Sequence, residues 1–217
     1  MFRASAVLVD NGEPTLLQAI LSLRNQTVPV EIVLCPGPNT DVSSVRGLVD
    51  KICEPKKGIG RARVEGILEA SSCYIICADS DCVYDSRYAE FAVKNLESGA
   101  RVVKAGTILP LKWDPLAVVE SATSILIPYE FALAFNRCEV LKIGLVEEAD
   151  RNKDNPRWDI GPFILMHFIP AIDHRMIVYT RFPTKGAQKL TKDYLPPLVA
   201  GATPLIFLVG LMGARML

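Results

Sequence analysis

Short apolar runs alternate with segments of helical periodicity over about the first hundred residues of this chain. The apolar runs predict strands at 5–9, 30–34, 51–53, 74–78 and 101–105. The intervening segments predict helices with inward-facing residues Leu16, Leu17, Ile20 and Leu21, then Val64, Ile67 and Leu68, then Tyr88, Phe91, Ala92 and Leu96. Repeated strand–helix–strand units are typical of a parallel sheet covered by helices on both faces. The pattern therefore predicts an α/β fold with a Rossmann-like, mostly parallel sheet flanked by helices.

The second half of the chain has a less regular pattern. We expect a helix from Asp114 to Ile125, a strand at 130–135, a short helix at 138–143, a polar loop at 150–156, a helix from Arg157 and a last strand at 176–179. The short helix is expected to end at Gly144, because glycine readily adopts the left-handed conformation that follows a helix.

Two carboxylates, Asp79 and Asp81, follow the strand predicted at 74–78 and are separated by one residue. In open α/β sheets, ligands bind outside the carboxyl ends of the strands. Mg²⁺ and Mn²⁺ prefer oxygen ligands and are often shared between one or two carboxylates and substrate phosphates. The position therefore predicts a divalent metal site facing a diphosphate, and the alternative is a solvated turn with two surface acids.

The composition bounds the partners and the compartment. The 217 residues suit one α/β domain with a tail, and the formal net charge is zero without a basic segment. Nucleic acid is therefore not an expected partner, because phosphate binding needs a basic footprint. The chain opens directly into a strand without a signal peptide's apolar region, so free thiols in a reducing compartment are expected. Cys77 and Cys82 bracket the carboxylates but lack zinc-site spacing, and we expect small buried hydrophobes there.

The C-terminal segment differs from the rest of the chain. Residues 195–214 contain no charged side chain, and their number matches the roughly 20 apolar residues that cross a bilayer. Three lysines precede this segment, namely Lys185, Lys189 and Lys192. The positive-inside rule then places the main domain at the cytoplasmic face of a membrane. We therefore expect an apolar helix over 195–217 that inserts into or docks on a membrane, with a core or interface helix as the alternative.

Several motifs occur in a characteristic order along the chain. They are the turn Asp10-Asn11-Gly12-Glu13, the helix end Ser22-Leu23-Arg24-Asn25-Gln26, the block Gly58-Ile59-Gly60-Arg61-Ala62-Arg63-Val64-Glu65-Gly66, the pair Asp79 and Asp81, the segments Phe135-Asn136-Arg137 and Glu147-Glu148, and Arg157-Trp158-Asp159. In this order they resemble the family-2 glycosyltransferases of the GT-A fold, over residues 4–182. The chain departs from the family where aspartates, an aromatic residue and an acidic residue are usual, at Cys35-Pro36-Gly37-Pro38, at Asp10 and at Trp158 respectively.

The resemblance implies a GT-A domain over 1–190, with a nucleotide-binding half at about 1–105 and an acceptor half at about 106–182. It implies an inverting glycosyltransferase that uses a UDP- or GDP-sugar donor and Mn²⁺ or Mg²⁺ at the D-x-D motif. Asp10 or Asn11 is expected to substitute for the missing aspartates as a contact to base and ribose. The acceptor is expected to be a sugar or a lipid phosphate such as a polyprenyl phosphate, because the apolar tail would place the site at a bilayer.

The resemblance also implies roles on the donor side. Asp81, assisted by Asp79, is expected to hold the metal, and Asp79 could instead contact ribose. Arg63 is expected to reach the donor's phosphates or base with the fixed fork of a guanidinium. The alternative is a surface arginine paired with Glu65 or Glu69.

On the acceptor side, Asp159 is expected to be the general base that takes a proton from the acceptor hydroxyl. The alternative is a helix-start aspartate near the N-terminal dipole, and Glu148 is the alternative base. A lipid phosphate needs no deprotonation, and Asp159 would then orient substrate or metal. Trp158 is either a platform for the acceptor sugar or an anchor in the core.

Two other functions remain open at this point. A nucleotidyltransferase on a similar fold would carry a longer glycine-rich loop with Arg or Lys after the first strand, which the turn at 10–13 does not provide. A catalytically degenerate relative could serve as a membrane scaffold or partner subunit. The missing aspartates at 35–36 favour that interpretation, whereas the retained Asp79, Asp81, Arg63 and Asp159 argue against it.

Overall fold

The computed structural model describes residues 2–54, 58–111, 132–155 and 158–180, all within the first of two structural units. The strands are β1 (Ala4–Asp10), β2 (Val30–Pro36), β3 (Lys51–Ile52), β4 (Tyr74–Asp79), β5 (Cys82–Tyr84), β6 (Val102–Pro110), β7 (Leu133–Asn136) and β8 (Ala171–Thr180). The helices are α1 (Leu16–Arg24), α2 (Ile59–Glu69), α3 (Tyr88–Glu97), α5 (Arg137–Lys142), α6 (Leu145–Arg151) and α7 (Ile160–His167), with a 3₁₀ turn η1 (Arg46–Leu48).

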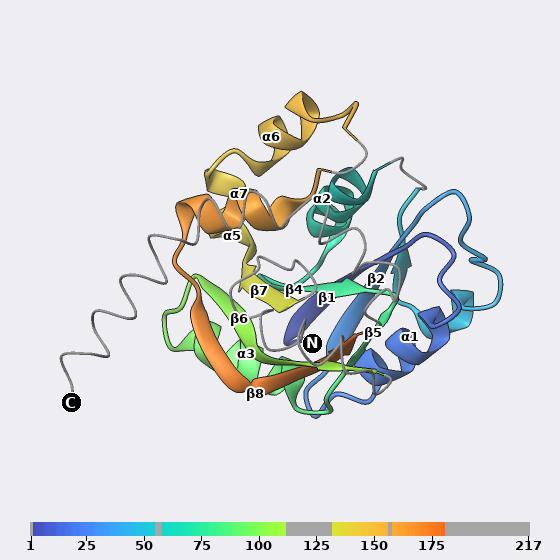
Figure 1. Ribbon diagram of the computed structural model, residues 1–217, viewed down its shortest axis with the longest axis horizontal. Helices are drawn as coiled ribbons and strands as arrows, with labels where there is room; N and C mark the ends of the chain where they lie inside the picture. Colours follow the sequence, from blue (N-terminus) through green and yellow to red (C-terminus); the bar gives the residue numbers. More distant parts are fainter. Residues whose placement is uncertain (1, 55–57, 112–131, 156–157, 181–217) are drawn as a thin grey trace. The chain divides into compact units, whose positions relative to one another are not determined.

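The strands form one eight-stranded sheet in the order β3-β2-β1-β4-β7-β6-β8-β5 (Figure 1). The first four strands in this order are parallel, and Val9 of β1 lies opposite both Cys35 of β2 and Asp79 of β4. Their carboxyl ends therefore meet at one edge of the sheet, which is where ligands bind in open α/β sheets. The four strands predicted from 5 to 78 are confirmed.

The other half of the sheet is mixed. β7 is antiparallel to β4 and β6, β5 is antiparallel to β8, and β6 is parallel to β8. Of the seven described strand pairs, four are parallel, so the α/β prediction with a mostly parallel sheet is confirmed, although parallel pairing dominates only the first half. The sequence did not predict β5, because a three-residue strand directly after the carboxylates is too short for a periodic signal.

Helices cover both faces of the sheet, with α2, α5, α6 and α7 on one side and α1 and α3 on the other (Figure 1). The inward stripe predicted for α3 is confirmed. In α1, the prediction was wrong for Leu17 and Leu21, which are exposed, whereas Ala19 and Leu23 are buried. Successive helical residues lie about 100° apart, so the core receives the i, i+3, i+4, i+7 set and not adjacent leucines. Leu68 of α2 is also exposed, contrary to the prediction.

Two short helices precede the last helix where one helix and a loop were expected. Gly144 has a φ of 85°, so it ends α5 in the left-handed region, as predicted, and α6 begins directly after it. The loop expected at 150–156 is therefore wrong at its start, because α6 extends to Arg151. The last helix begins at Ile160 and not at Arg157, because Asp159 caps its first turn.

Some sequence-based predictions lie outside the described residues. They are the helix from Asp114 to Ile125, the lysines before the tail and the apolar helix at 195–217. Within the described ranges, no helix combines the length and the apolar character that a bilayer crossing requires. The six cysteines are free thiols, and Cys77 and Cys82 are buried as expected.

Gly66 fixes how closely α2 approaches the sheet. A Cβ atom at this position would lie 2.4 Å from the Cys35 Sγ and 2.5 Å from the Val7 Cγ1. We expect Gly66→Ala to lower the free energy of unfolding by about 1–3 kcal/mol, because overpacking outweighs the gain in helix propensity. Gly47→Ala is the matched control, since nothing lies within 4 Å of its added Cβ. Urea denaturation measures both, and equal midpoints for the two variants would contradict this account of the α2 packing.

Candidate functional site

The candidate site lies at the carboxyl ends of β1, β2 and β4. The strand register brings Asp10 at the end of β1, Pro36 at the end of β2 and Asp79 at the end of β4 to the same edge. Asp81 follows β4 by two residues, and Asn11 follows β1 directly. The structure therefore brings the predicted donor-side residues into one region.

Asp10 organises the turn after β1. Its Oδ2 accepts hydrogen bonds from the Gly12 N–H (2.9 Å) and the Thr40 hydroxyl (2.6 Å), and its Oδ1 accepts one from the Glu13 N–H (3.0 Å). Burial by itself would raise the pKa of Asp10, but hydrogen bonds from Ser80, Thr40 and these amides leave it below its usual value. The Asp10 carboxylate is thus committed to local structure, and the exposed Asn11 beside it is the freer of the two predicted base or ribose contacts.

Arg63 is completely buried and lies between two carboxylates. Its Nη2 donates to the Asp79 Oδ1 (2.8 Å) and to the Asp159 Oδ2 (3.2 Å), and its Nε donates to the Asp159 Oδ1 (3.1 Å). The alternative of a surface arginine paired with Glu65 or Glu69 is therefore wrong. The described contacts of the guanidinium are internal, and a direct contact between Arg63 and a donor stays a prediction.

The charges of this cluster act on one another. Burial opposes the charge of Arg63, but the Asp159 and Asp79 carboxylates hold its pKa well above the usual value. Burial also raises the pKa of Asp79; Arg63 opposes this rise, and Asp159 adds to it. Burial and the charge of Asp79 raise the pKa of Asp81 to about 6. With the three carboxylates ionised and one guanidinium beside them, the cluster is net negative and attracts cations.

The carboxylates of the D-x-D motif fit a divalent cation that also binds a substrate. Among its described contacts, Asp79 accepts the hydrogen bond of Arg63 at Oδ1, which leaves Oδ2 for another ligand. Asp81 accepts a hydrogen bond from the Cys82 thiol at Oδ1, with a distance of 3.3 Å. The described part of the chain contains no group of three or more His, Cys, Asp or Glu side chains that could hold a metal alone. A cation here would therefore take further oxygens from phosphates or water, as Mg²⁺ and Mn²⁺ commonly do.

Asp159 is both an N-cap and a partner of Arg63. Its Oδ1 accepts from the Ile160 N–H at 2.7 Å as well as from Arg63, and its side chain is 15% exposed. One oxygen, Oδ1, thus receives two donors, whereas Oδ2 receives one described donor. The predicted helix-start geometry is correct, and the side chain keeps acceptor capacity at Oδ2.

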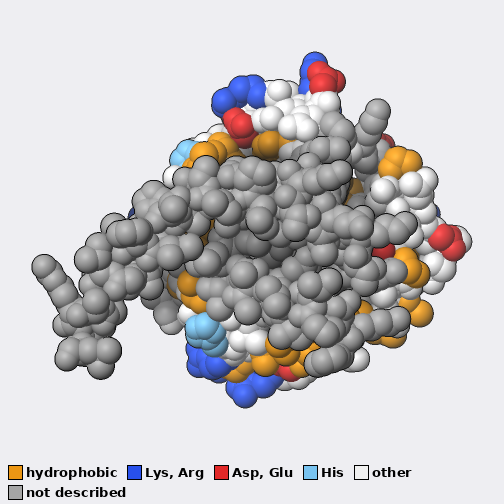
Figure 2. Space-filling model, in the orientation of Figure 1, with side chains coloured by type: hydrophobic (Ala, Val, Ile, Leu, Met, Phe, Trp, Pro, Cys, Tyr) orange, Lys and Arg blue, Asp and Glu red, His pale blue; other side chains and the backbone are white. Residues whose placement is uncertain are grey.

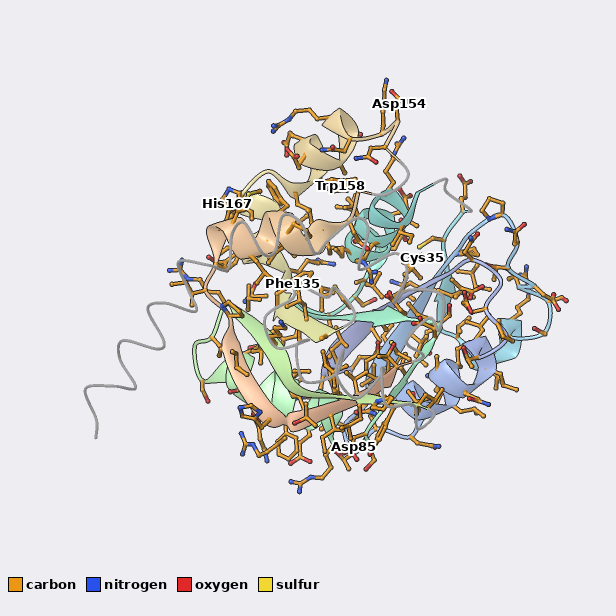
Figure 3. The ribbon with its side chains drawn as sticks, viewed as in Figure 1. Cys35, Asp85, Phe135, Asp154, Trp158 and His167 are labelled. Atoms are coloured by element: carbon orange, nitrogen blue, oxygen red, sulfur yellow. The ribbon has the colours of Figure 1, made fainter. Side chains whose placement is uncertain are left out.

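Trp158 lies between α7 and α2, at the point labelled in Figure 3. A Cβ at Gly60 would lie 2.3 Å from the indole, and the Gly60 N–H donates to the Trp158 carbonyl at 3.1 Å. The ring also packs against the core beneath α2, α6 and α7. These contacts support the anchoring role of Trp158 over the role of a platform for a sugar.

Glu148 is not brought together with the carboxylate cluster by its described contacts. It pairs with Arg151 at 2.9 Å and accepts from the Asn152 amide at 2.8 Å, both on or next to α6. Figure 2 shows basic and acidic side chains side by side over this part of the molecule. Its prediction as alternative base therefore gains no geometric support.

The sequence did not single out three residues that shape the site. Thr40 and the buried Ser80 hold Asp10, and the Tyr84 hydroxyl accepts from the Asp79 N–H at 3.2 Å. Thr40 lies 30 residues from its partner, so no local pattern identifies it. Tyr84 is five residues after Asp79 in a strand that the sequence did not reveal.

Comparisons with known proteins give one family and one recurrent fold. Residues 7–114 match the family model described as glycosyl transferase family 2. The crystal structure of S. aureus TarS 1–349 in complex with UDP aligns with a TM-score of 0.61 at 14% identity, covering 88% of this chain and 63% of that chain. The complex of TarS 1–349 with UDP-GlcNAc aligns with a TM-score of 0.51 at 16% identity, covering 66% of this chain and 47% of that chain.

At these identities the likeness to TarS is one of fold, and the chain spans at most 63% of the TarS chains that it matches here. Among curated proteins, no sequence matches this chain.

Proposed function

The chain carries a family-2 glycosyltransferase domain, and from this premise we propose that it moves a sugar, with inversion, from a nucleoside-diphosphate donor to an acceptor. The donor would lie at the carboxyl ends of β1, β2 and β4. Mn²⁺ or Mg²⁺ would be held by Asp81 and Asp79.

The observation that carries the proposal is the cluster of three partly buried carboxylates, Asp79, Asp81 and Asp159, around the buried Arg63. Three carboxylates and one guanidinium come from β4, the turn after it, α2 and the start of α7. Carboxyl groups whose pKa is raised by burial and by a neighbouring charge, as in Asp79 and Asp81, cluster at functional sites.

Each residue has a role in this proposal. Departure of the nucleoside diphosphate builds negative charge, which a cation held by Asp81 and Asp79 would neutralise. Asp159 would receive the proton of an acceptor hydroxyl at Oδ2, which carries only one described hydrogen bond. Arg63 holds Asp159 through both oxygens, so the carboxylate keeps one orientation while the acceptor approaches. With a phosphate acceptor, Asp159 would orient the acceptor without taking a proton.

UDP is the first nucleotide to test, because S. aureus TarS, which shares the fold, has been crystallised with UDP and UDP-GlcNAc. GDP is the comparison, because the turn at 10–13 and the segment at 35–38 lack the side chains that usually distinguish the base in the family.

The acceptor is proposed to be lipid-linked and the enzyme to act at the cytoplasmic face of a membrane. This rests on the apolar composition of residues 195–214 and the three lysines before them. Recovery of the full chain in washed membranes tests the location, and recovery in the soluble fraction would argue against it.

Calorimetric titration of UDP and GDP, each with and without Mn²⁺, tests the donor site directly. We expect one of the two to bind, and to bind at least about tenfold more tightly with Mn²⁺, because Asp79 and Asp81 would hold the cation and the cation would attract the negative diphosphate. Turnover should release a free nucleoside diphosphate, whereas a nucleotidyltransferase would release pyrophosphate. A folded protein that binds neither nucleotide would contradict the proposal and favour the scaffold.

A further inference from the structure

The guanidinium of Arg63 connects two carboxylates that have different parts in the reaction. Asp79 lies at the end of β4, 16 residues from Arg63, and Asp159 lies at the start of α7, 96 residues from it. Arg63 is wholly buried, and the side chains of Asp79 and Asp159 are 28% and 15% exposed. The one buried guanidinium of Arg63 therefore hydrogen-bonds both to the carboxylate proposed for the donor side and to the carboxylate proposed for the acceptor side.

A second contact holds α2 close to the start of α7. Gly60, one turn before Arg63 on α2, donates its N–H to the carbonyl of Trp158, directly before Asp159, at 3.1 Å. The close fit of the indole over Gly60 holds this approach. The position of Asp159 beside Arg63 is thus set by the backbone as well as by the ion pair.

The charged groups of this cluster interact electrostatically with one another. Charges a few ångströms apart interact more strongly in a protein than in water, because the effective dielectric around them is lower. A divalent cation at Asp79 and Asp81 would be repelled by the charge of Arg63. Asp159 balances the charge of Arg63 through two hydrogen bonds.

We propose that Arg63 is a positioning residue that couples the donor site to Asp159, so that the negative charge of Asp159 supports binding of the metal–nucleotide donor. The inference rests on the proposed function, because the charge that arrives at Asp79 and Asp81 is that of the donor's cation. Lysine cannot replace Arg63, since a single ammonium cannot reach both carboxylates with the same fork of donors.

The test is a double-mutant cycle on donor binding, made with Arg63→Met, Asp159→Asn and the double variant. The asparagine side chain of D159N can still cap α7, so the single variant removes charge and not the helix start. We expect D159N to raise the Kd of UDP or GDP with Mn²⁺ about tenfold, because Arg63 is left with less compensation. We expect R63M/D159N to bind the nucleotide more tightly than D159N does, with a Kd within about threefold of that of the unmodified chain. The reason is that the double variant also lacks the Arg63 guanidinium, which would repel the metal ion.

Arg61→Met and Asp150→Asn are the matched controls, because both residues are exposed, on α2 and α6, and their replacement removes the same charges. They should leave the Kd unchanged within about twofold. A purely structural Arg63 would make the double variant bind worse than D159N. That result, or a Kd for D159N within about twofold of the unmodified chain, overturns the coupling.

The same proteins separate this inference from the proposed function. If the unmodified chain binds neither nucleotide with Mn²⁺, the proposed function fails, and the coupling to the donor site fails with it. If the unmodified chain binds the donor and D159N binds it equally well, the coupling alone fails and the proposed function stands.

Discussion

Asp159→Asn is expected to lower kcat by about 10²–10⁴-fold with a hydroxyl acceptor, at saturating metal and donor. The amide keeps the hydrogen bond to the Ile160 N–H but cannot take up the acceptor's proton. Saturation separates this loss from any weaker donor binding, and steady-state release of nucleoside diphosphate measures it. With a polyprenyl phosphate acceptor, the loss should be less than about tenfold if the phosphate needs no base.

Glu148→Gln decides between the two predicted bases. Glu148 is engaged with Arg151 and Asn152, so its replacement should leave kcat within about threefold. A large loss in E148Q together with a small loss in D159N, using a hydroxyl acceptor, would transfer the role of base to Glu148. The kcat losses of D159N and E148Q together therefore identify the base, and the comparison of the two acceptors shows whether a base is needed.

The parts of the fold that the sequence predicts correctly depend on neighbours along the chain. The strands β1, β2 and β4 show continuous apolar runs because both faces of a parallel sheet are covered. The position of the D-x-D motif after β4 follows from the same local signal. In contrast, β5 and the antiparallel pairing of β7 depend on partners that are far away in the sequence.

The candidate site shows the same limit. The resemblance placed Arg63, Asp79 and Asp159 in one site, but it did not reveal that Arg63 is buried and shared between the two carboxylates. Nor could composition show that Asp10 uses its hydrogen-bonding capacity on its own turn and on Thr40. Hydrogen bonds between residues tens of positions apart leave no periodicity, so they are visible only once the chain has folded.

Asp81→Asn is expected to stabilise the metal-free protein while abolishing metal-dependent donor binding. The pKa of Asp81 is raised from 3.8 to about 6 by burial and by the charge of Asp79, so ionised Asp81 is unfavourable in the folded state. Asparagine removes this penalty, which we expect to raise the free energy of unfolding by about 1–3 kcal/mol at about pH 7.5. The melting temperature should rise by a few degrees in EDTA, as is usual for a domain of this size.

The pH dependence follows from the direction of the shift. Between about pH 4 and pH 6 the folded state binds more protons at Asp81 than the unfolded state, so this group's contribution to stability falls as pH rises through that window. The advantage of D81N should therefore be full at about pH 7.5 and only about a third as large near about pH 4.5, and D150N serves as the exposed control at both values. Mn²⁺ with nucleotide should stabilise the unmodified chain and not D81N, because only the former binds it. A variant that melts below the unmodified chain at neutral pH, or one that still binds nucleotide in a Mn²⁺-dependent way, would show that Asp81 is a structural acid and not a strained metal ligand.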